Sequence, residues 1–469
     1  MTVSSIRNIL FSDIRTSSTF KLATFVVCLM VASSCQTAGS DKAKVLGPEL
    51  IGWVTESMTD IMVHDITNPP LAARFYAYAT LAGYETLSQE NPEILSFHGV
   101  LNDYPEIKVS GDFPYHNPHV SAVLAMIETA ASMQPSGQDL HQLKDSFLDS
   151  CRQWGFSERT IEDAMGYGKE VSSGILAYAQ QDLYKNISNY PRYTPKQEDG
   201  YWYPTPPAYF APVEPYFNSI RPFTLVQPDQ FKPKPPVTFS TSSDSEFYKL
   251  MQEVYEVELT KEQREIAAFW DCNPFALEET GHLMVGLKQI SPGGHWMGIT
   301  NIACTDANLS FEQSMEITAA VAIGLTDGFL SCWDEKYRSN RIRPETAIRK
   351  YIDTSYRPLL QTPPFPEYLS GHSTISTTAA TILTHYFGDN FSYTDTVEEK
   401  YQLPSRDFTS FLQASEEASI SRLYGGIHFM DAIVEGQKQG KLVGNWVIQT
   451  LESSGLASPL SLSSLSINE

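Results

Sequence analysis

Apolar side chains recur at the spacing of an α-helix over most of this chain. In residues 48–65 the apolar positions fall three or four residues apart from Leu50 to Met62, which predicts a helix with one buried face. The same pattern predicts helices at 69–87, 118–133, 138–153 and 158–184. No segment alternates apolar and polar residues as a strand would. We therefore expect an all-α protein built of helical bundles with long loops.

A segment of different composition follows these helices. Residues 186–237 are rich in tyrosine and proline and have almost no helical period. A loop of this length inside a folded domain is usually functional or packs over a surface. We expect it to wrap the helical body, where it could also wall a pocket.

Helix starts with capping-box chemistry recur after the loop. The pairs are Ser243 with Glu246, Thr260 with Gln263, and Ser310 with Gln313. The last pair would open a long helix that reaches about residue 340. These patterns predict an N-terminal helical region with the Pro-rich loop, residues 35–240, and a C-terminal helical bundle, residues 241–455. We expect both to form one compact unit.

The first 35 residues have the pattern of an export signal. Arg7, Arg15 and Lys21 precede an apolar run at 22–32, and small residues then lead to Cys35. The run is too short to span a bilayer comfortably and fits the core of a signal peptide. We expect residues 1–34 to be a lipoprotein signal peptide and Cys35 to carry a lipid anchor. The protein would then be exported, to the periplasm or the cell surface. Ordinary signal cleavage nearby is the alternative.

Net charge limits the classes of partner. The 469-residue chain carries a formal charge of −22, which argues against nucleic-acid binding because that needs a basic surface. Four cysteines follow Cys35, and their spacing matches no zinc-binding pattern. We expect most of them to be buried free thiols. Apart from the signal segment, no uninterrupted apolar run reaches the length of a membrane span.

A basic cluster stands out against this acidic background. Residues 336–350 hold six lysines and arginines against one acid, Glu345. Lys336 and Arg343 are seven residues apart, which would place them on one face of a helix. Pro344 disfavours helix at Arg343, so the helix should end by that point. Alone, the cluster could be a solvated basic face.

Two further fragments could complete a pocket for a tetrahedral oxyanion. Ser370, Gly371 and His372 precede a helical pattern, and a helix start offers free N–H groups and the positive end of the helix dipole. Arg422 and His428 flank a Gly-Gly pair that would let both side chains turn toward one point. Burying a phosphate or vanadate ion requires such fixed cations and donors.

The three fragments together resemble a known signature. Lys336 with Arg343-Pro344, then Ser370-Gly371-His372, then Ser421-Arg422 with His428, are similar to the blocks shared by vanadium-dependent haloperoxidases and the type 2 phosphatidic acid phosphatase superfamily. The likeness is greatest to bacterial, iodide-preferring haloperoxidases. Trp333 and Phe365 add to it, as do the strings at 269–274 and 201–207.

The resemblance implies a role for each matching residue. His428 would bond the metal of a vanadate cofactor. Lys336, Arg343 and Arg422 would neutralise its oxygens, and Ser370 with the Gly371 N–H would donate hydrogen bonds to them. His372 would act as acid–base. Trp333 and Phe365 would form an apolar rim, and the catalytic residues would be His372, His428 and Lys336. The partners implied are hydrogen peroxide and a halide, with an organic acceptor left open.

Two positions depart from the family pattern. Leu369 stands where proline often precedes the Ser-Gly-His block. Ala432 stands where an aspartate often orients the metal-binding histidine. Asp431 and Glu435 are the nearby acids that could take over this role.

Three functions remain open on the sequence alone. A haloperoxidase would use vanadate as a Lewis acid on peroxide. A soluble acid phosphatase would use His428 as nucleophile and His372 to protonate the leaving alcohol. A surface lipoprotein with an inactive pocket is the third reading, which the complete set of seven pocket residues disfavours. Trp333 and Phe365 favour the peroxidase.

Other histidines have simpler explanations. His116 and His119 lie in a Tyr-His-Asn-Pro-His string whose spacing could bind a metal, but no nearby carboxylate or cysteine at ligand spacing supports this. We expect them to pack at a helix entry. His295, at a Gly-Gly turn, could face the pocket or serve a structural role.

Overall fold

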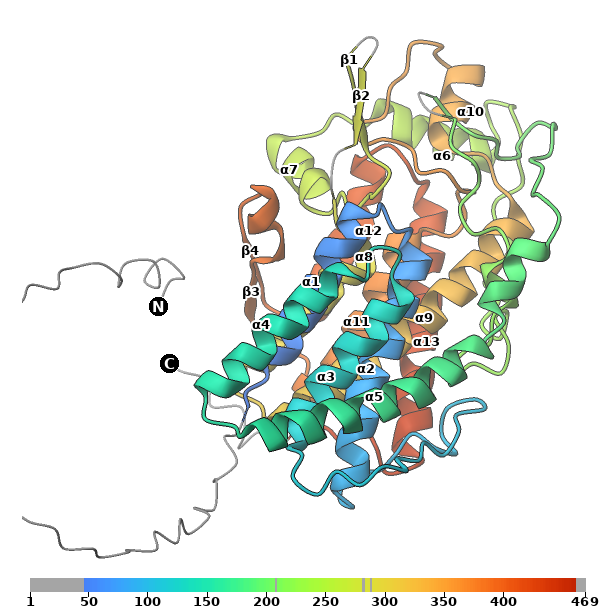
Figure 1. Cartoon of the computed structure of the whole chain (residues 1–469). Helices are drawn as coiled ribbons and strands as arrows, with labels where there is room; N and C mark the ends of the chain where they lie inside the picture. The colour runs from blue at the N-terminus through green and yellow to red at the C-terminus, as the bar shows by residue number, and fades with distance from the viewer. Residues whose placement is uncertain (1–45, 207–208, 281–282, 287–288, 461–469) are drawn as a thin grey trace, which may run out of the picture. The chain divides into compact units, whose positions relative to one another are not determined.

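The long amphipathic helices expected from the sequence pack side by side in the computed structural model (Figure 1). The structure describes residues 46–206, 209–280, 283–286 and 289–460. The described elements, in chain order, are α1 Glu49–His64, α2 Pro69–Glu90, α3 Pro118–Met133, α4 Asp139–Gln153, α5 Glu158–Gln180, η2 Tyr184–Asn189, η3 Phe217–Ser219, α6 Glu246–Glu256, α7 Lys261–Phe269, β1 Leu277–Thr280, β2 Leu283–Gly286, α8 Pro292–Asp306, α9 Phe311–Ser339, α10 Pro344–Tyr351, α11 Gly371–Phe387, β3 Tyr393–Asp395, η4 Val397–Tyr401, β4 Arg406–Phe408, α12 Phe411–Tyr424 and α13 Met430–Glu452.

Two short hairpins correct the expectation of no strands. β1 pairs with β2 and β3 with β4, each antiparallel. Each strand has only three or four residues. Such a length is too short to show the alternation by which strands are recognised. The all-α class itself is confirmed.

Local capping explains where the helices begin. The boxes at Thr260 and Ser310 form as expected, with the third helical residue of each, Gln263 and Gln313, bonding back to the cap. The box at Ser243 is wrong, because Ser245 caps α6 instead. The predicted fifth helix, which was to run to residue 184, ends at Gln180.

The core joins the two halves of the chain around α9. This helix packs against α2 from the N-terminal half and against α11 and α13 from the C-terminal half. An 18-residue window of α9 has a mean hydropathy of 1.3 and is 94% buried, as in a core helix. No continuous apolar run marks α9 in the sequence, because Thr, Ser and Gly interrupt it. Residues 46–460 belong to one compact unit, and the division at residue 240 stays a prediction.

The Tyr- and Pro-rich segment wraps α9, as expected. Asp327 of α9 is fully buried and accepts hydrogen bonds from the backbone of Phe223, Thr224 and Leu225. Nearer the end of α9, the carbonyl of Val213 accepts from the indole of Trp333 at 3.2 Å. The loop therefore fixes the helix that carries Lys336. The predicted signal segment and Cys35 lie outside the described residues, so export and lipid anchoring stay predictions.

Small residues let α13 approach α11 closely. A Cβ added at Gly440 would lie 2.3 Å from the carbonyl oxygen of Thr374, and one at Gly444 would lie 2.8 Å from Cβ of Thr381. α11 begins at the Ser-Gly-His block and α13 begins just after His428, so this contact sets the distance between two halves of the predicted site.

Gly440→Ala should therefore destabilise the protein. Alanine in a helix gains up to about 1 kcal/mol over glycine, but the overpacking costs about 1–3 kcal/mol. We expect the clash to win and lower the free energy of unfolding by about 1–2 kcal/mol, measured by urea denaturation. Lys441→Ala, at the exposed neighbouring position, is the control. A Gly440→Ala protein more stable than the parent would contradict the close packing.

Candidate active site

Lys336 and Arg343 are both fully buried, but they do not share a helix face as the spacing suggested. α9 ends at Ser339, Asn340 takes a left-handed conformation with φ of 52°, and Arg343 is the extended residue before α10. The turn, rather than helical periodicity, brings the two cations into one region. Pro344 at the first position of α10 ends the helical run, as predicted.

Among the described residues, no carboxylate forms an ion pair with either cation. Nζ of Lys336 donates to the carbonyl oxygens of Pro366 and Glu367, each at 3.1 Å, and to that of Leu369. Nε of Arg343 donates to the carbonyl oxygen of Phe365 at 2.9 Å. Burial lowers the pKa of Lys336 to about 7 and that of Arg343 to about 10. The nearby charge of Glu367 opposes both shifts but does not overcome the effect of burial.

The Ser-Gly-His block forms the N-terminus of α11, as expected. Ser370 is the N-cap, and its Oγ accepts from the backbone N–H of Ser373 at 3.2 Å. His372 lies in the first turn, and its buried Nε2 has no hydrogen-bond partner among the described residues. Burial, together with the charge of Arg422 nearby, lowers the pKa of His372 well below its usual range.

The third fragment brings Arg422 and His428 to one cavity. Arg422 lies near the end of α12, and its Nη2 donates to the carbonyl of Trp270 at 2.6 Å. The chain then turns through Gly426, whose φ of 72° favours glycine. His428 follows, directly before α13. Its Nε2 lies 3.1 Å from Nη1 of Arg343.

Glu367 orients His428, and neither of the acids expected from the sequence does. Oε1 of Glu367 lies 2.8 Å from Nδ1 of His428, and the carboxylate is fully buried. Because a carboxylate only accepts, Nδ1 carries the proton and Nε2 keeps its lone pair. Asp431 instead pairs with Arg341, and Glu435 pairs with Lys438. The sequence signal for Glu367 was its place three residues before Ser370, within the Ser-Gly-His fragment.

Arg341 completes this network. Its Nε donates to Oε2 of Glu367 at 2.6 Å, and its two terminal nitrogens reach Asp431 at 2.6 and 2.8 Å. The charge of Glu367 is thus already paired. Burial, with the nearby cations Arg343 and Lys336, holds the pKa of His428 well below its usual range. His428 is a neutral imidazole near neutral pH.

A cavity of about 30 Å³ lies between these groups. Of the predicted residues, Gly371, His372, Arg422, His428, Trp333 and Phe365 line it. Lys336 and Arg343 border it through Phe365, whose ring centre is 5.0 Å from each cationic group. Residue type and spacing do not indicate the rest of the wall, because its residues carry no charge and come from distant segments: Pro69, Cys272, Asn273, Pro274, Phe275, Pro292, Phe329, Pro363 and Ile427.

The other candidate histidines lie elsewhere. His116 stacks on Tyr167 with ring centres 4.1 Å apart, and His119 pairs with Glu312 at 2.6 Å. Both thus pack against helices, as expected. His295 is fully buried but does not line the cavity.

Comparisons with known proteins identify the family. The crystal structure of a bacterial vanadium-dependent iodoperoxidase is 42% identical, with a TM-score of 0.81, and the match covers 86% of this chain and 96% of that one. The chain belongs to the vanadium-dependent haloperoxidases. A family model, the VCPO second helical-bundle domain, matches residues 350–454.

More distant haloperoxidases share the fold. The holo form of a bacterial vanadium-dependent chloroperoxidase matches 83% of this chain and 93% of its own at 12% identity, with a TM-score of 0.62. An apo form matches 87% and 95% at 14% identity, with a TM-score of 0.60. No curated protein sequence matches the chain. Family membership makes this haloperoxidase an enzyme that acts on peroxide with a vanadate cofactor.

The cavity fits such an anion. Lys336 and Arg343 form no ion pair with a carboxylate of the described residues, and Nη1 of Arg422 is 4.0 Å from Oδ1 of Asp271. Nη2 of Arg343 is a buried donor with no partner among the described residues, like Nε2 of His372. Leaving buried polar groups and charges unpaired is costly. A tetrahedral oxyanion in the cavity would satisfy these groups together.

The lowered pKa values of His372 and His428 predict how stability depends on pH. The pKa values of His372 and His428 are lower in the folded protein than in the unfolded chain. Below about pH 6.5 the unfolded chain therefore binds more protons, and the free energy of unfolding decreases as the pH is lowered. Each histidine contributes a slope of up to about 1.4 kcal/mol per pH unit. In the anion-free protein, His372→Gln should reduce the slope between pH 6.5 and 5 by about this amount, measured by urea denaturation. His141→Gln, at an exposed position, is the control, and equal slopes in both variants would contradict a lowered pKa of His372.

Proposed function

We propose that this haloperoxidase oxidises iodide with hydrogen peroxide. Bromide, which is harder to oxidise, would be the next halide that it accepts. The apolar wall of the cavity carries the proposal. Trp333 and Phe365 pack with ring centres 5.0 Å apart beside Gly371, His372 and His428. Iodide is large, weakly hydrated and easily oxidised, so it loses little by leaving water for such a wall. The 42%-identical structure, described as that of an iodoperoxidase, supports the same halide.

His428 is proposed to hold the metal through Nε2. The lone pair at this nitrogen is available because Glu367 keeps the proton at Nδ1. Arg343, whose Nη1 lies 3.1 Å from that nitrogen, would bind an oxygen of the same anion. Bound vanadate supplies a Lewis acid that activates peroxide without changing its own oxidation state.

The remaining polar residues neutralise charge and move protons. Lys336 and Arg422 would take up negative charge on the anion, and Ser370 and the Gly371 N–H would lie at its α11 side. His372 is neutral and its Nε2 is unpartnered, so it can take a proton from peroxide and later return one. Trp333 and Phe365 keep water from the halide side.

A direct assay tests the halide and separates the enzyme from a phosphatase, whose substrate has the same shape and charge. The purified protein is stripped of bound anion and given orthovanadate, hydrogen peroxide, and iodide or bromide. We expect iodide oxidation that requires vanadate, exceeds bromide oxidation and is competed away by phosphate. His428→Ala should abolish it. Hydrolysis of an aryl phosphate without vanadate, and no halide oxidation, would overturn the proposal.

Glu367→Gln should weaken vanadate binding. Glutamine keeps the shape but lacks the charge that orients and polarises His428, and losing such a partner typically costs about 10- to 100-fold in metal affinity. Equilibrium dialysis of vanadate measures the effect. Glu435→Gln, whose parent residue pairs with Lys438 away from the histidine, should stay within about 2-fold. Equal affinities for the two variants would show that Glu367 does not support the metal site.

A further inference from the structure

A second group of buried side chains with metal-binding chemistry lies beside the cavity. Cys272 follows α7, His295 belongs to α8 and Glu398 lies in η4. Nδ1 of His295 is 3.4 Å from Sγ of Cys272 and 3.1 Å from Oε1 of Glu398. The sulfur and the carboxylate oxygen are 3.8 Å apart. All three side chains are buried, so one thiol, one imidazole and one carboxylate converge in the interior of the protein.

The imidazole is held in the orientation that a metal ligand needs. Nε2 of His295 lies 2.7 Å from Oδ2 of Asp395, which is also fully buried. The ring stacks on Trp270 with centres 4.6 Å apart. Histidines that bind metals usually give their second nitrogen to a carboxylate in this way. Nδ1 is thereby left to face Cys272 and Glu398.

The spacing of the three ligand atoms matches one face of a tetrahedron. Zinc bonds of about 2.0–2.3 Å to N, O and S place tetrahedral ligand atoms roughly 3.3–3.6 Å apart. The observed separations are 3.1, 3.4 and 3.8 Å. A thiolate with an imidazole selects zinc over the hard ions magnesium and calcium, which prefer oxygen ligands only.

The charges at this cluster also favour a cation. Among the described residues, neither Asp395 nor Glu398 forms an ion pair with lysine or arginine, and His295 is the partner of both. Two buried carboxylates and a thiol therefore surround a single imidazole. A protonated His295 balances only one of the two carboxylates, whereas a divalent cation would balance both.

We propose that Cys272, His295 and Glu398 bind a zinc ion, distinct from the vanadate site, with the fourth position taken by solvent. Binding breaks the S–H bond of Cys272 and forms an S–Zn bond, and the proton passes to solvent with any proton on Nδ1 of His295. The spacing of the cysteines along the sequence could not show this site, because one ligand comes from each of three segments.

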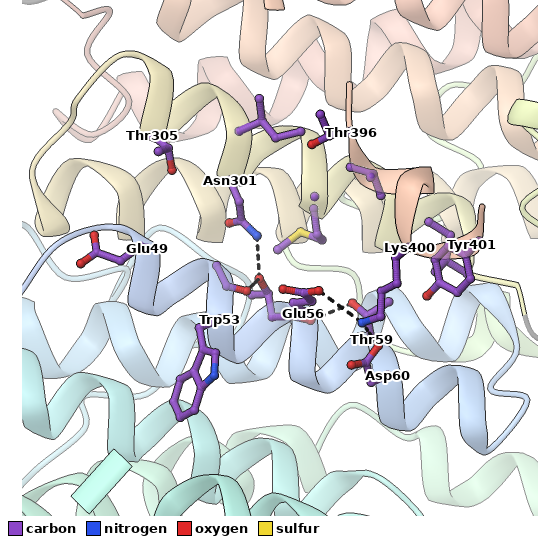
Figure 2. Close-up of a pocket in the computed structure, with 18 of the residues that line it drawn as sticks. Glu49, Trp53, Glu56, Thr59, Asp60, Asn301, Thr305, Thr396, Lys400 and Tyr401 are labelled. Atoms are coloured by element: carbon purple, nitrogen blue, oxygen red, sulfur yellow. Dashed lines mark hydrogen bonds and ion pairs between the residues drawn. The ribbon is translucent and has the colours of Figure 1, made fainter. Parts of the chain in front are cut away.

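The position of the ion suggests a structural role next to the catalytic cavity. Cys272 and its neighbours Asn273, Pro274 and Phe275 line that cavity. α8 and η4, which carry the other two ligands, form two sides of an open cleft of about 680 Å³ against α1 (Figure 2). Lys400 of η4 reaches across this cleft to Glu56 and Asp60. The ion would link the wall segment at Cys272 to α8 through His295 and to η4 through Glu398.

Cobalt substitution tests the site in the full-length protein. The protein is freed of metals with a chelator, exchanged into chelator-free buffer, saturated with orthovanadate and titrated with Co²⁺. We expect about one Co²⁺ per chain, a cobalt–thiolate charge-transfer band in the near-ultraviolet difference spectrum, and displacement by Zn²⁺. No band and no bound cobalt or zinc would leave a hydrogen-bonded cluster only and overturn the proposal.

Two variants assign the ligands. Cys272→Ala should remove the band, whereas Cys304→Ala, which removes another buried thiol, should keep it. A band that persists in Cys272→Ala would overturn the site. If Cys272→Ala does not fold by circular dichroism, Glu398→Gln decides: we expect at least about 10-fold weaker Zn²⁺ binding from the lost charge, and unchanged affinity would refute the assignment.

Discussion

The candidate active site depends on two basic side chains, Lys336 and Arg343, that are buried and form no ion pair with a carboxylate in the described part of the chain. Their hydrogen bonds go to the carbonyl oxygens of residues 365, 366, 367, 369 and 427 and to His428. Carbonyl dipoles hold the cations in place but do not neutralise them. In the anion-free protein, the rest of the fold must therefore offset the cost of burying these unpaired basic groups. The close packing of α9, α11 and α13 supplies that stability.

The pocket has a negative charge nearby, on Glu367, but this carboxylate is paired with side chains other than Lys336 and Arg343. Glu367 is fully buried close to Lys336 and Arg343, yet both of its oxygens are committed, one to His428 and one to Arg341. Arg341 in turn binds Asp431. This series of paired side chains polarises His428 but leaves it neutral. It also leaves Lys336 and Arg343 free to bind an anion. An acid facing Lys336 or Arg343 directly would instead fill the pocket with its own carboxylate.

The cavity joins this polar floor to an apolar wall. Trp333 is held by the loop at Val213, and Phe365 packs on it and on both cations. Polar groups and aromatic rings therefore face the same small cavity. The segment at Cys272 forms another part of the wall, and Sγ of Cys272 lies 3.4 Å from Nδ1 of His295.

The sequence by itself determined most of the helices, several of their caps and the three fragments that carry the polar residues of the candidate site. The capping boxes at Thr260 and Ser310, the N-cap Ser370 and the break at Pro344 depend on groups within four residues of one another, so local chemistry fixes them. Only the tertiary structure decided the partner of His428, the turn that brings Arg343 to Lys336, and the Cys272–His295–Glu398 cluster. Glu367 and His428 are 61 residues apart, and helix packing alone sets which of several nearby acids comes within reach of the imidazole.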